Sequence, residues 1–388
     1  MFEKIIKEKL LKSLRKIELG EIHLTTPEGE TFYFKANNPG LSADITLKDW
    51  RVIANLNIKG DIALAEDFRD GFWETQNLTN LIHFGLENEK VFQGYIKGSF
   101  FYNCLAKLGY LTQRNTIKQS KKNIHAHYDL GNDFYKLWLD ESMTYSSAIY
   151  KNEHEPLQNA QNHKYDRILD KILNFEHILE IGCGWGGFAE RAIQTKGCTI
   201  KGITLSHQQQ SYAKARLEKY QDAATIVIED YRNQTGKYDA IVSIEMIEAV
   251  GRKYWATYFK KLQSLLKPGG KIFIQSIVIE DSLFKNYVKG TDLIRTHIFP
   301  GGLLPSRQAL NEQMSKAKLC CTDSYAFGAD YAKTLSQWLE NFTGQEEKLL
   351  QLGFDKRFQR MWKFYLASCI AAFRHKKIDV VQLELSHV

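Results

Sequence analysis

Residues 177–187 read His-Ile-Leu-Glu-Ile-Gly-Cys-Gly-Trp-Gly-Gly, an apolar strand that runs directly into a glycine-rich turn. Glycines let the backbone turn tightly and let a ligand approach without a Cβ in the way. Around this stretch the pattern alternates. Helices are predicted over 162–174, 187–195, 207–220 and 254–266, and strands over 199–204, 225–229, 238–244 and 271–279. This βαβ rhythm predicts a parallel sheet with helices on both faces, which binds ligands beyond the carboxyl ends of its strands.

The glycine-rich turn has a spacing of its own. A single such turn also occurs in dinucleotide-binding folds. Here it reads G-x-G-x-G-G and an acid, Glu180, precedes the first glycine. Both features are similar to the S-adenosylmethionine (SAM) sites of Rossmann-like methyltransferases, in which the loop passes under the methionine and ribose part and the acid meets the α-ammonium group. The predicted SAM residues of this turn are Glu180, Gly182, Cys183, Gly184, Trp185 and Gly186.

The next two strand ends supply further candidates for cofactor binding. The second strand ends without an acid for the ribose hydroxyls, so Gln209, on the first turn of the next helix, is the candidate substitute. A solvated helix-start residue is the alternative for Gln209. After the third strand, Asp230 fits a contact to the adenine amino group and Tyr231 can stack nearby. The candidates from these strand ends are Thr204, Leu205, Ser206, Gln209, Asp230 and Tyr231.

The length of 388 residues favours two domains. The first twenty residues have helical periodicity with a basic opposite face, and Glu21 to Ile62 alternates like strands and hairpins. The polar, basic stretch 112–124 predicts a linker. We therefore expect a small α+β domain over 1–111 and the larger α/β domain over 125–388.

The composition is that of an ordinary globular protein, with 44% hydrophobic and 25% charged residues. The longest apolar run, 364–373, is too short to span a bilayer, and the N-terminus lacks the apolar stretch of a signal peptide. The six cysteines form no C-x-x-C pair. A reducing cytoplasmic setting without disulfides or metal is expected. The net charge of +7 leaves nucleic acid, an anionic membrane or an acidic small molecule open.

Residues 127–135, HYDLGNDFY, begin a series of motifs that occur in the same order in a known family. The series continues at 143–147, 180–187, 202–209, 229–232, 245–251, 298–302, 327–331 and 369–374. Residues 66–73 also resemble the N-terminal domain of the full-length members. The chain resembles the cyclopropane-fatty-acyl-phospholipid synthases and the related mycolic acid methyltransferases, which implies a Rossmann-like class I SAM methyltransferase fold.

The resemblance implies transfer of the SAM methyl group to the cis double bond of an unsaturated acyl chain in a membrane phospholipid. A carbocation forms, a bound bicarbonate ion removes a proton, and a cyclopropane ring closes. Tyr145 and Ser146 join the predicted SAM pocket. Cys369 matches a cysteine nominated as catalytic, although its small apolar neighbours indicate pocket lining. The positions that match the bicarbonate ligands are Ser147, Glu248, Gln275, Ile277 and Tyr331, with Glu248 and Tyr331 as the catalytic pair.

Two positions depart from the common family pattern, because Ser147 replaces a cysteine and Gln275 replaces a histidine. These departures leave a methylene- or methyl-branched product open beside the ring. Glu245 and Glu248 also have a structural alternative, which is to cap a helix or to pair with Arg252 or its lysine neighbour.

Other functions stay open beside this one. Some alkaloid N-methyltransferases share the motif order, and a non-catalytic lipid- or SAM-binding protein is a further alternative. A nucleic-acid methyltransferase is not favoured, because no Asn-Pro-Pro-Tyr-like tetrad or basic stripe occurs.

The phospholipid substrate predicts a cytoplasmic enzyme that associates peripherally with the inner membrane face. The candidate docking residues are those of the N-terminal helix, Lys118, Lys121, Lys122 and the pair Phe72-Trp73, with ordinary surface as the alternative. The oligomeric state is left open, a homodimer included.

Overall fold

The structure is a computed structural model that describes residues 2–96, 130–172 and 175–388. The chain divides into two compact units, which we call the N-terminal unit and the sheet unit. The N-terminal unit comprises 1–112, 290–298 and 342–375, and the sheet unit comprises 113–289, 299–341 and 376–388. The sequence predicted a single domain over 125–388. In the structure, two segments of that range, 290–298 and 342–375, belong to the N-terminal unit. The predicted linker lies outside the described residues.

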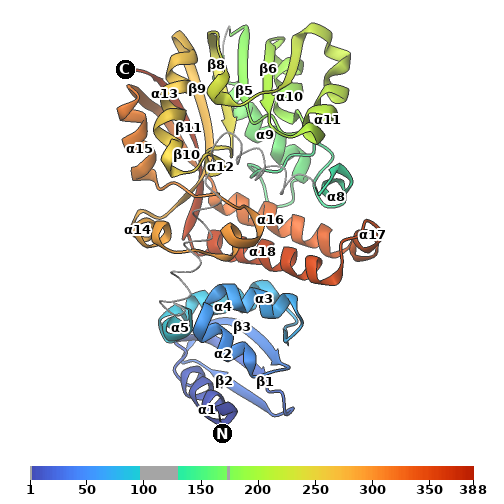
Figure 1. Ribbon diagram of the computed structural model, residues 1–388, viewed down its shortest axis with the longest axis vertical. Coiled ribbons are helices and arrows are strands. Elements are labelled where there is room, and N and C mark those ends of the chain that lie inside the picture. Colours follow the sequence, from blue (N-terminus) through green and yellow to red (C-terminus); the bar gives the residue numbers. More distant parts are fainter. Residues whose placement is uncertain (1, 97–129, 173–174) are drawn as a thin grey trace. The chain divides into compact units, whose positions relative to one another are not determined.

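The sheet unit contains a seven-stranded sheet in the order β10-β11-β9-β8-β5-β6-β7 (Figure 1). Its strands are β5 (His177–Ile181), β6 (Thr199–Thr204), β7 (Ala224–Ile228), β8 (Tyr238–Ile244), β9 (Leu266–Ile279), β10 (Leu319–Ala326) and β11 (Ile378–His387). Strands β7, β6, β5, β8 and β9 are parallel, and β11 is antiparallel to both of its neighbours. The predicted α/β fold with a mostly parallel sheet is confirmed, and every strand predicted for this sheet is present.

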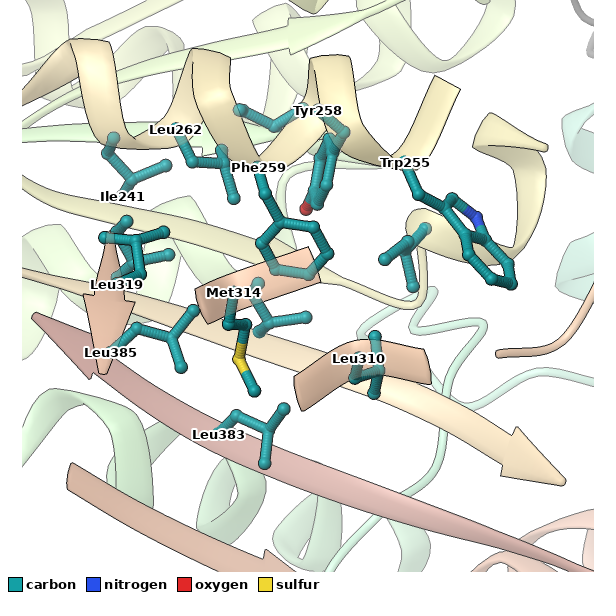
Figure 2. Packing of buried hydrophobic residues seen from close by; sticks show 14 of the residues in the cluster. Ile241, Trp255, Tyr258, Phe259, Leu262, Leu310, Met314, Leu319, Leu383 and Leu385 are labelled. Atoms are coloured by element: carbon teal, nitrogen blue, oxygen red, sulfur yellow. The ribbon is translucent and has the colours of Figure 1, made fainter. Parts of the chain in front are cut away.

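Helices cover both faces of this sheet. Alternate side chains of β5 pack into two different cores, one on each face. Ile178 packs in a cluster with α9 (Leu157–Leu169), α10 (Gly187–Lys196) and α11 (His207–Leu217). Leu179 packs in the opposite cluster, with α13 (Trp255–Leu265) and α15 (Arg307–Lys316). Successive strand side chains point to opposite faces, so Glu180 shares the face of Ile178. Figure 2 shows the α13 side chains Tyr258, Phe259 and Leu262 packed with Leu310 and Met314 of α15.

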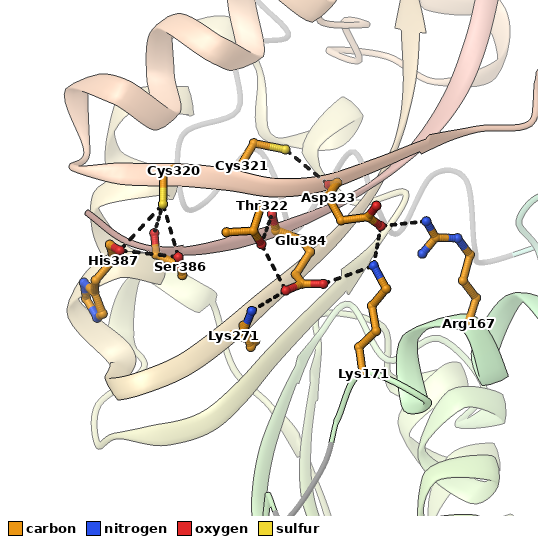
Figure 3. A network of polar contacts seen from close by, with 10 residues as sticks. All are labelled: Arg167, Lys171, Lys271, Cys320, Cys321, Thr322, Asp323, Glu384, Ser386 and His387. Atoms are coloured by element: carbon orange, nitrogen blue, oxygen red, sulfur yellow. Dashed lines mark hydrogen bonds and ion pairs between the residues drawn. The ribbon is translucent and has the colours of Figure 1, made fainter.

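The C-terminal strand is tied into the sheet by charge (Figure 3). Glu384 of β11 accepts hydrogen bonds from Lys271 of β9 and from Thr322 of β10, the latter at 3.0 Å. Lys171, just beyond α9, lies 3.1 Å from Glu384 and also binds Asp323. The β9–β11 register pairs Gln275 with Gln382, so this strand carries a buried amide to the centre of the sheet.

The N-terminal unit has a four-stranded sheet in the order β2-β1-β3-β4. Its strands are β1 (Leu19–Thr25), β2 (Thr31–Lys35), β3 (Asn38–Leu47) and β4 (Trp73–Glu74), and its helices are α1 (Phe2–Leu14), α2 (Arg51–Lys59), α3 (Asp61–Arg69), α4 (Leu78–Glu87), α5 (Glu89–Ile96), α17 (Glu346–Gln351) and α18 (Lys356–Arg374). The strand pattern predicted up to Ile62 is wrong over α2. The adjacent side chains of Val52 and Ile53 are both buried, which suits one face of a helix and not the alternation of a strand.

Trp73 belongs to the core of the N-terminal unit. Its side chain is fully buried, its Nε1 donates to the Leu64 carbonyl at 2.9 Å, and its ring lies 4.7 Å from that of Phe68. Phe364 of α18 packs on the same rings. The prediction that Trp73 docks on a membrane is therefore wrong. Lys118, Lys121 and Lys122 lie outside the described residues.

The remaining helices are α8 (Asn132–Lys136), α12 (Ile247–Val250), α14 (Asp281–Lys289) and α16 (Gly328–Thr343). Across the described ranges, no helix combines the length and the apolar character that a bilayer crossing requires.

Candidate active site

A cavity of about 170 Å³ lies where the parallel strands of the sheet unit end. Twelve of the predicted SAM residues line it: Tyr145, Ser146, Glu180, Gly182, Cys183, Gly184, Trp185, Thr204, Leu205, Gln209, Asp230 and Tyr231. Gly186 and Ser206 support it from outside. Gly186 directly precedes α10, and the Ser206 hydroxyl caps α11 by accepting the Gln209 N–H at 3.3 Å. The structure therefore brings together residues that the sequence placed at three strand ends.

Two glycines shape the loop for different reasons. Gly182 has φ +81°, and a Cβ there would come within 3.0 Å of Met246 Cγ. Gly184 has φ +51°, and no heavy atom lies within 4 Å of its Cβ position. The first glycine is needed by the packing. A side chain on the second would instead enter open space beside the cavity, where a ligand would lie.

Glu180 brings an incompletely paired carboxylate to the cavity. Its side chain is buried, and its Oε2 has no hydrogen-bond partner among the described residues. Burial raises the pKa of Glu180 to about 8, and the nearby Lys164 charge opposes this. A buried carboxylate oxygen without a partner is costly unless a ligand cation completes it. These residues therefore fit the ammonium group that the predicted cofactor carries.

Lys164 is a site residue that the sequence interpretation missed. Its Nζ donates to Ser146 Oγ at 2.5 Å and to Gln161 Oε1 at 2.7 Å. Burial lowers the pKa of Lys164 to about 7, against the opposing effect of nearby Glu245. The signal was present, because Lys164 follows Ala160 and precedes Ile168 by four residues each, on the buried stripe of α9.

The ribose and adenine candidates already bind protein groups. The Thr204 hydroxyl donates to Gln209 Oε1 at 2.8 Å, and Gln209 is buried, so it is not the solvated residue of the alternative. Asp230 accepts from Arg232 Nε at 2.8 Å and from Nη2 at 2.6 Å. Arg232 thus fixes the carboxylate that was predicted to face adenine.

Three predicted bicarbonate ligands converge on a carboxylate of the protein, that of Glu245. The Ser147 N–H and Gln275 Nε2 donate to Glu245 Oε1 at 2.9 and 2.7 Å. The Tyr331 hydroxyl donates to Glu245 Oε2 at 2.8 Å. Glu245 follows β8, lines the cavity and has φ +51°, a left-handed conformation that costs a non-glycine residue about 1–2 kcal/mol.

The donors around Glu245 are held in place. Gln382 Nε2 donates to Gln275 Oε1 at 3.0 Å, which turns the Gln275 NH₂ group toward Glu245. The Glu245 backbone N–H donates to the Gln275 carbonyl at 2.8 Å, so both residues are locked in the sheet. Burial raises the pKa of Glu245, while these hydrogen bonds and the Lys164 charge favour its ionised form.

Glu248 makes a separate set of contacts. Its Oε1 accepts from the Ile277 N–H at 2.6 Å and from the Ser276 hydroxyl at 2.9 Å, and it does not line the cavity. Burial first, and then the Glu245 charge, raise the pKa of Glu248 to about 8. Glu245 therefore binds Gln275 of the sheet and Tyr331 of the 327–331 motif, and Glu248 binds Ser276 and Ile277 of the sheet, where the structural alternative had offered Arg252.

The hydrogen-bond donors predicted to hold bicarbonate are already engaged by protein carboxylates, and the Glu248 Oε2 oxygen, which has no partner among the described residues, is not a donor for an anion. The backbone N–H of Ser147, the amide of Gln275 and the Tyr331 hydroxyl are used by Glu245. The Ile277 N–H is used by Glu248. A planar protein carboxylate thus takes the donors that the resemblance assigned to a planar ion. We derive no step through bicarbonate.

Other residues of the quoted motifs are not among those that line the cavity, or they lie outside the described residues. Cys369 lies on α18 in the N-terminal unit, and burial raises the pKa of its thiol to about 12, which disfavours a nucleophilic thiolate. Phe134 and Tyr135 are fully buried and pack against each other. His127 lies outside the described residues. Among the residues that the structure describes, no cluster of His, Cys, Asp and Glu could hold a metal ion.

Comparison with known proteins gives consistent similarities. The model of the family described as mycolic acid cyclopropane synthetase matches residues 115–383. The chain is 34% identical to the cyclopropane-fatty-acyl-phospholipid synthase of Escherichia coli K12, over 90% of both chains. It is 40% identical to the tuberculostearic acid methyltransferase UfaA1 of Mycobacterium tuberculosis, over 69% of this chain and 65% of that protein. The crystal structure of mycolic acid cyclopropane synthase CmaA1 with SAH is 29% identical with a TM-score of 0.64, covering 68% of this chain and 97% of that one.

Proposed function

The chain belongs to the cyclopropane synthase family of SAM-dependent methyltransferases, and from this premise we propose its substrate and product. It methylates the cis double bond of an unsaturated acyl chain in a membrane phospholipid and closes a cyclopropane ring. One observation carries the proposal: the similarity to the E. coli phospholipid synthase extends over 90% of this chain, whereas the mycolic acid proteins match about two thirds of it, 68%.

The cavity supplies what this reaction requires. SAM, when bound, provides an electrophilic methyl group. Glu180 holds the cofactor's ammonium end through its Oε2 oxygen, which has no partner within the described part of the chain. Gly184 leaves open space beside the cavity, and the Thr204–Gln209 pair lines the cavity with polar groups.

An aromatic cluster adjoins the cavity at Tyr145. Tyr145 lines the cavity, and its ring centroid lies 5.4 Å from those of both Trp138 and Trp338. Tyr331 meets Trp338 edge-on at 6.0 Å. Aromatic faces stabilise a cation and exclude water, which supports chemistry on an alkene that has no charge to bind.

A second candidate product is a methylene- or methyl-branched chain. The observation that favours it is the 40% identity to a protein named a methyltransferase rather than a cyclopropane synthase. The similarity to coclaurine N-methyltransferase, at 15% identity, reflects the fold alone. Transfer to an acyl chain is common to both lipid products, and only the fate of the cation differs.

The test is to incubate the purified protein with SAM and vesicles of cis-unsaturated phosphatidylethanolamine and phosphatidylglycerol. We expect SAH release together with acyl chains that gain one CH₂ and resist hydrogenation. Vesicles of fully saturated lipid are the control and should give no product. A gain of one carbon as a new double bond that hydrogenates would favour the branched product. No methylation of any unsaturated lipid would reject the proposed function.

A further inference from the structure

We infer that the base of this reaction is the carboxylate of Glu245, built into the chain where a captured bicarbonate ion was expected. The inference rests on the proposed function and deepens it, since it names the group that receives the proton. The motivating geometry is the convergence of Ser147, Gln275 and Tyr331 on Glu245 beside the cofactor cavity.

The contacts leave Glu245 able to take a proton. Its Oε1 accepts two N–H groups, and its Oε2 accepts the Tyr331 hydroxyl. A carboxylate oxygen has two lone pairs, so Oε2 keeps one for an incoming proton. Burial raises the pKa of Glu245, which suits a group that accepts a proton, while the hydrogen bonds given above and the nearby Lys164 charge act in favour of the ionised form.

The orientation of Gln275 makes the arrangement specific. The Gln275 amide donates to Glu245 because its oxygen is committed to Gln382. Ser147 contributes a backbone N–H, which its side chain does not determine. The departures at 147 and 275 therefore leave intact the donors that a carboxylate needs, and Glu245 supplies that carboxylate covalently.

The reaction balances with this assignment. The π pair of the alkene forms a bond to the methyl carbon, and the methyl–sulfur pair stays on sulfur. A C–H bond of the new methyl group then breaks, its electron pair closes the ring on the cationic carbon, and the proton goes to Glu245 Oε2. No external anion takes part.

The strained backbone is a further sign of a placed group. Glu245 has φ +51°, where glycine is preferred. Such strain persists where the surrounding structure over-determines it, and it is concentrated at active sites. A glycine would relieve it, so selection for stability alone would not favour glutamate here.

The main test compares Glu245→Gln and Glu245→Gly with the wild type in vesicle assays, in buffer freed of carbon dioxide and in buffer with added bicarbonate. Wild-type turnover should not depend on bicarbonate. Glu245→Gln should lose roughly 10²–10⁴-fold in turnover while SAM affinity, measured by calorimetry, changes little. Glu245→Gly accepts the left-handed backbone at this position and leaves the donors from Ser147, Gln275 and Tyr331 without an acceptor. Bicarbonate can then bind these donors and should restore the turnover of this variant by roughly tenfold or more.

A second readout is independent of catalysis. Titration of bicarbonate into the wild type, followed by calorimetry, should show no saturable binding at millimolar concentration, whereas Glu245→Gly should bind it. Saturable binding to the wild type, a wild-type requirement for bicarbonate, or near wild-type turnover of Glu245→Gln would each overturn the inference. If the wild type methylates no lipid, the proposed function fails, and the binding titrations still decide whether Glu245 occupies the anion position.

Discussion

Two carboxylates line the same cavity in opposite states. Glu180 has an oxygen, Oε2, without a partner among the described residues, whereas both oxygens of Glu245 accept hydrogen bonds. Lys164 lies close enough to influence the pKa of each. The difference teaches which carboxylate awaits a ligand and which acts with the partners it already has. The first is expected to control cofactor binding, and the second is expected to control turnover.

The largest effect on the ligand side is expected from Gly184→Val. The valine side chain would enter open space beside the cavity, so SAM affinity should fall by at least about 100-fold, or ~2.7 kcal/mol. Calorimetry measures the SAM affinity of each variant. The matched control is Gly197→Val, at the end of α10, where φ is +64° and a Cβ likewise meets nothing. Both variants should lose similar stability, and Gly197→Val should keep its SAM affinity. Equal affinities for SAM would refute the cofactor assignment of the loop.

Glu180→Gln should weaken SAM binding by roughly 10–100-fold, because a charged hydrogen bond contributes about 1.5–3 kcal/mol. The pH dependence gives a sharper test. The pKa of Glu180 is raised to about 8, so without ligand the carboxyl is mostly protonated at pH 7. Wild-type SAM affinity should therefore rise with pH between about 6 and 8, and the slope should vanish in Glu180→Gln.

The raised pKa of Glu180 has the opposite effect on the stability of the ligand-free protein, which falls as pH rises. A carboxyl whose folded pKa lies above its unfolded value stabilises the fold at low pH, and this contribution is lost as pH rises from about 4.5 to about 8. Thermal unfolding with and without SAM should show ligand stabilisation that grows over this window. A pH-independent difference between the two would mean that Glu180 does not meet the cofactor's ammonium group.

Glu248→Gln should reduce turnover by less than roughly tenfold, well below the loss expected for Glu245→Gln. Glu248 Oε1 binds the Ile277 N–H and the Ser276 hydroxyl, and the amide oxygen of glutamine can replace it. The two variants should be compared in one vesicle assay with equal SAM binding. A reversed order of the two losses would return the base function to Glu248.

Glu245 and Glu248 also show how far the sequence predicts the site. The strand ends and the glycine loop were predictable, because each motif is local and the parallel sheet brings its strand ends together. The family pattern pointed to Glu248, but it does not contain the distances that decide between residues three apart. The choice depends on the left-handed backbone of Glu245 and on Gln382 from a C-terminal strand that the sequence pattern did not predict.

The fold shows the same limit. The βαβ series was predicted with small boundary differences, since its periodicity is local. The grouping of 342–375 with the N-terminal unit depends on packing such as Phe364 against Trp73, which no local pattern records. Lys164 was missed for a related reason. A lysine on a buried helix stripe becomes informative only when the opposing acids are known.

A loss of turnover comparable with that of Glu248→Gln is expected from Tyr331→Phe. The change removes one hydrogen bond to Glu245 Oε2 and leaves the carboxylate, Gln275 and the Ser147 N–H in place. A single hydrogen bond to a charged group contributes about 1.5–3 kcal/mol when fully lost, so turnover should fall by roughly tenfold. Tyr331→Phe should have almost no further effect in a Glu245→Gln background, since the acceptor it serves is then an amide. This double-mutant cycle measures the interaction energy between Tyr331 and Glu245. Additive losses, or a Tyr331→Phe loss that persists without Glu245, would show that the hydroxyl acts on something other than this carboxylate.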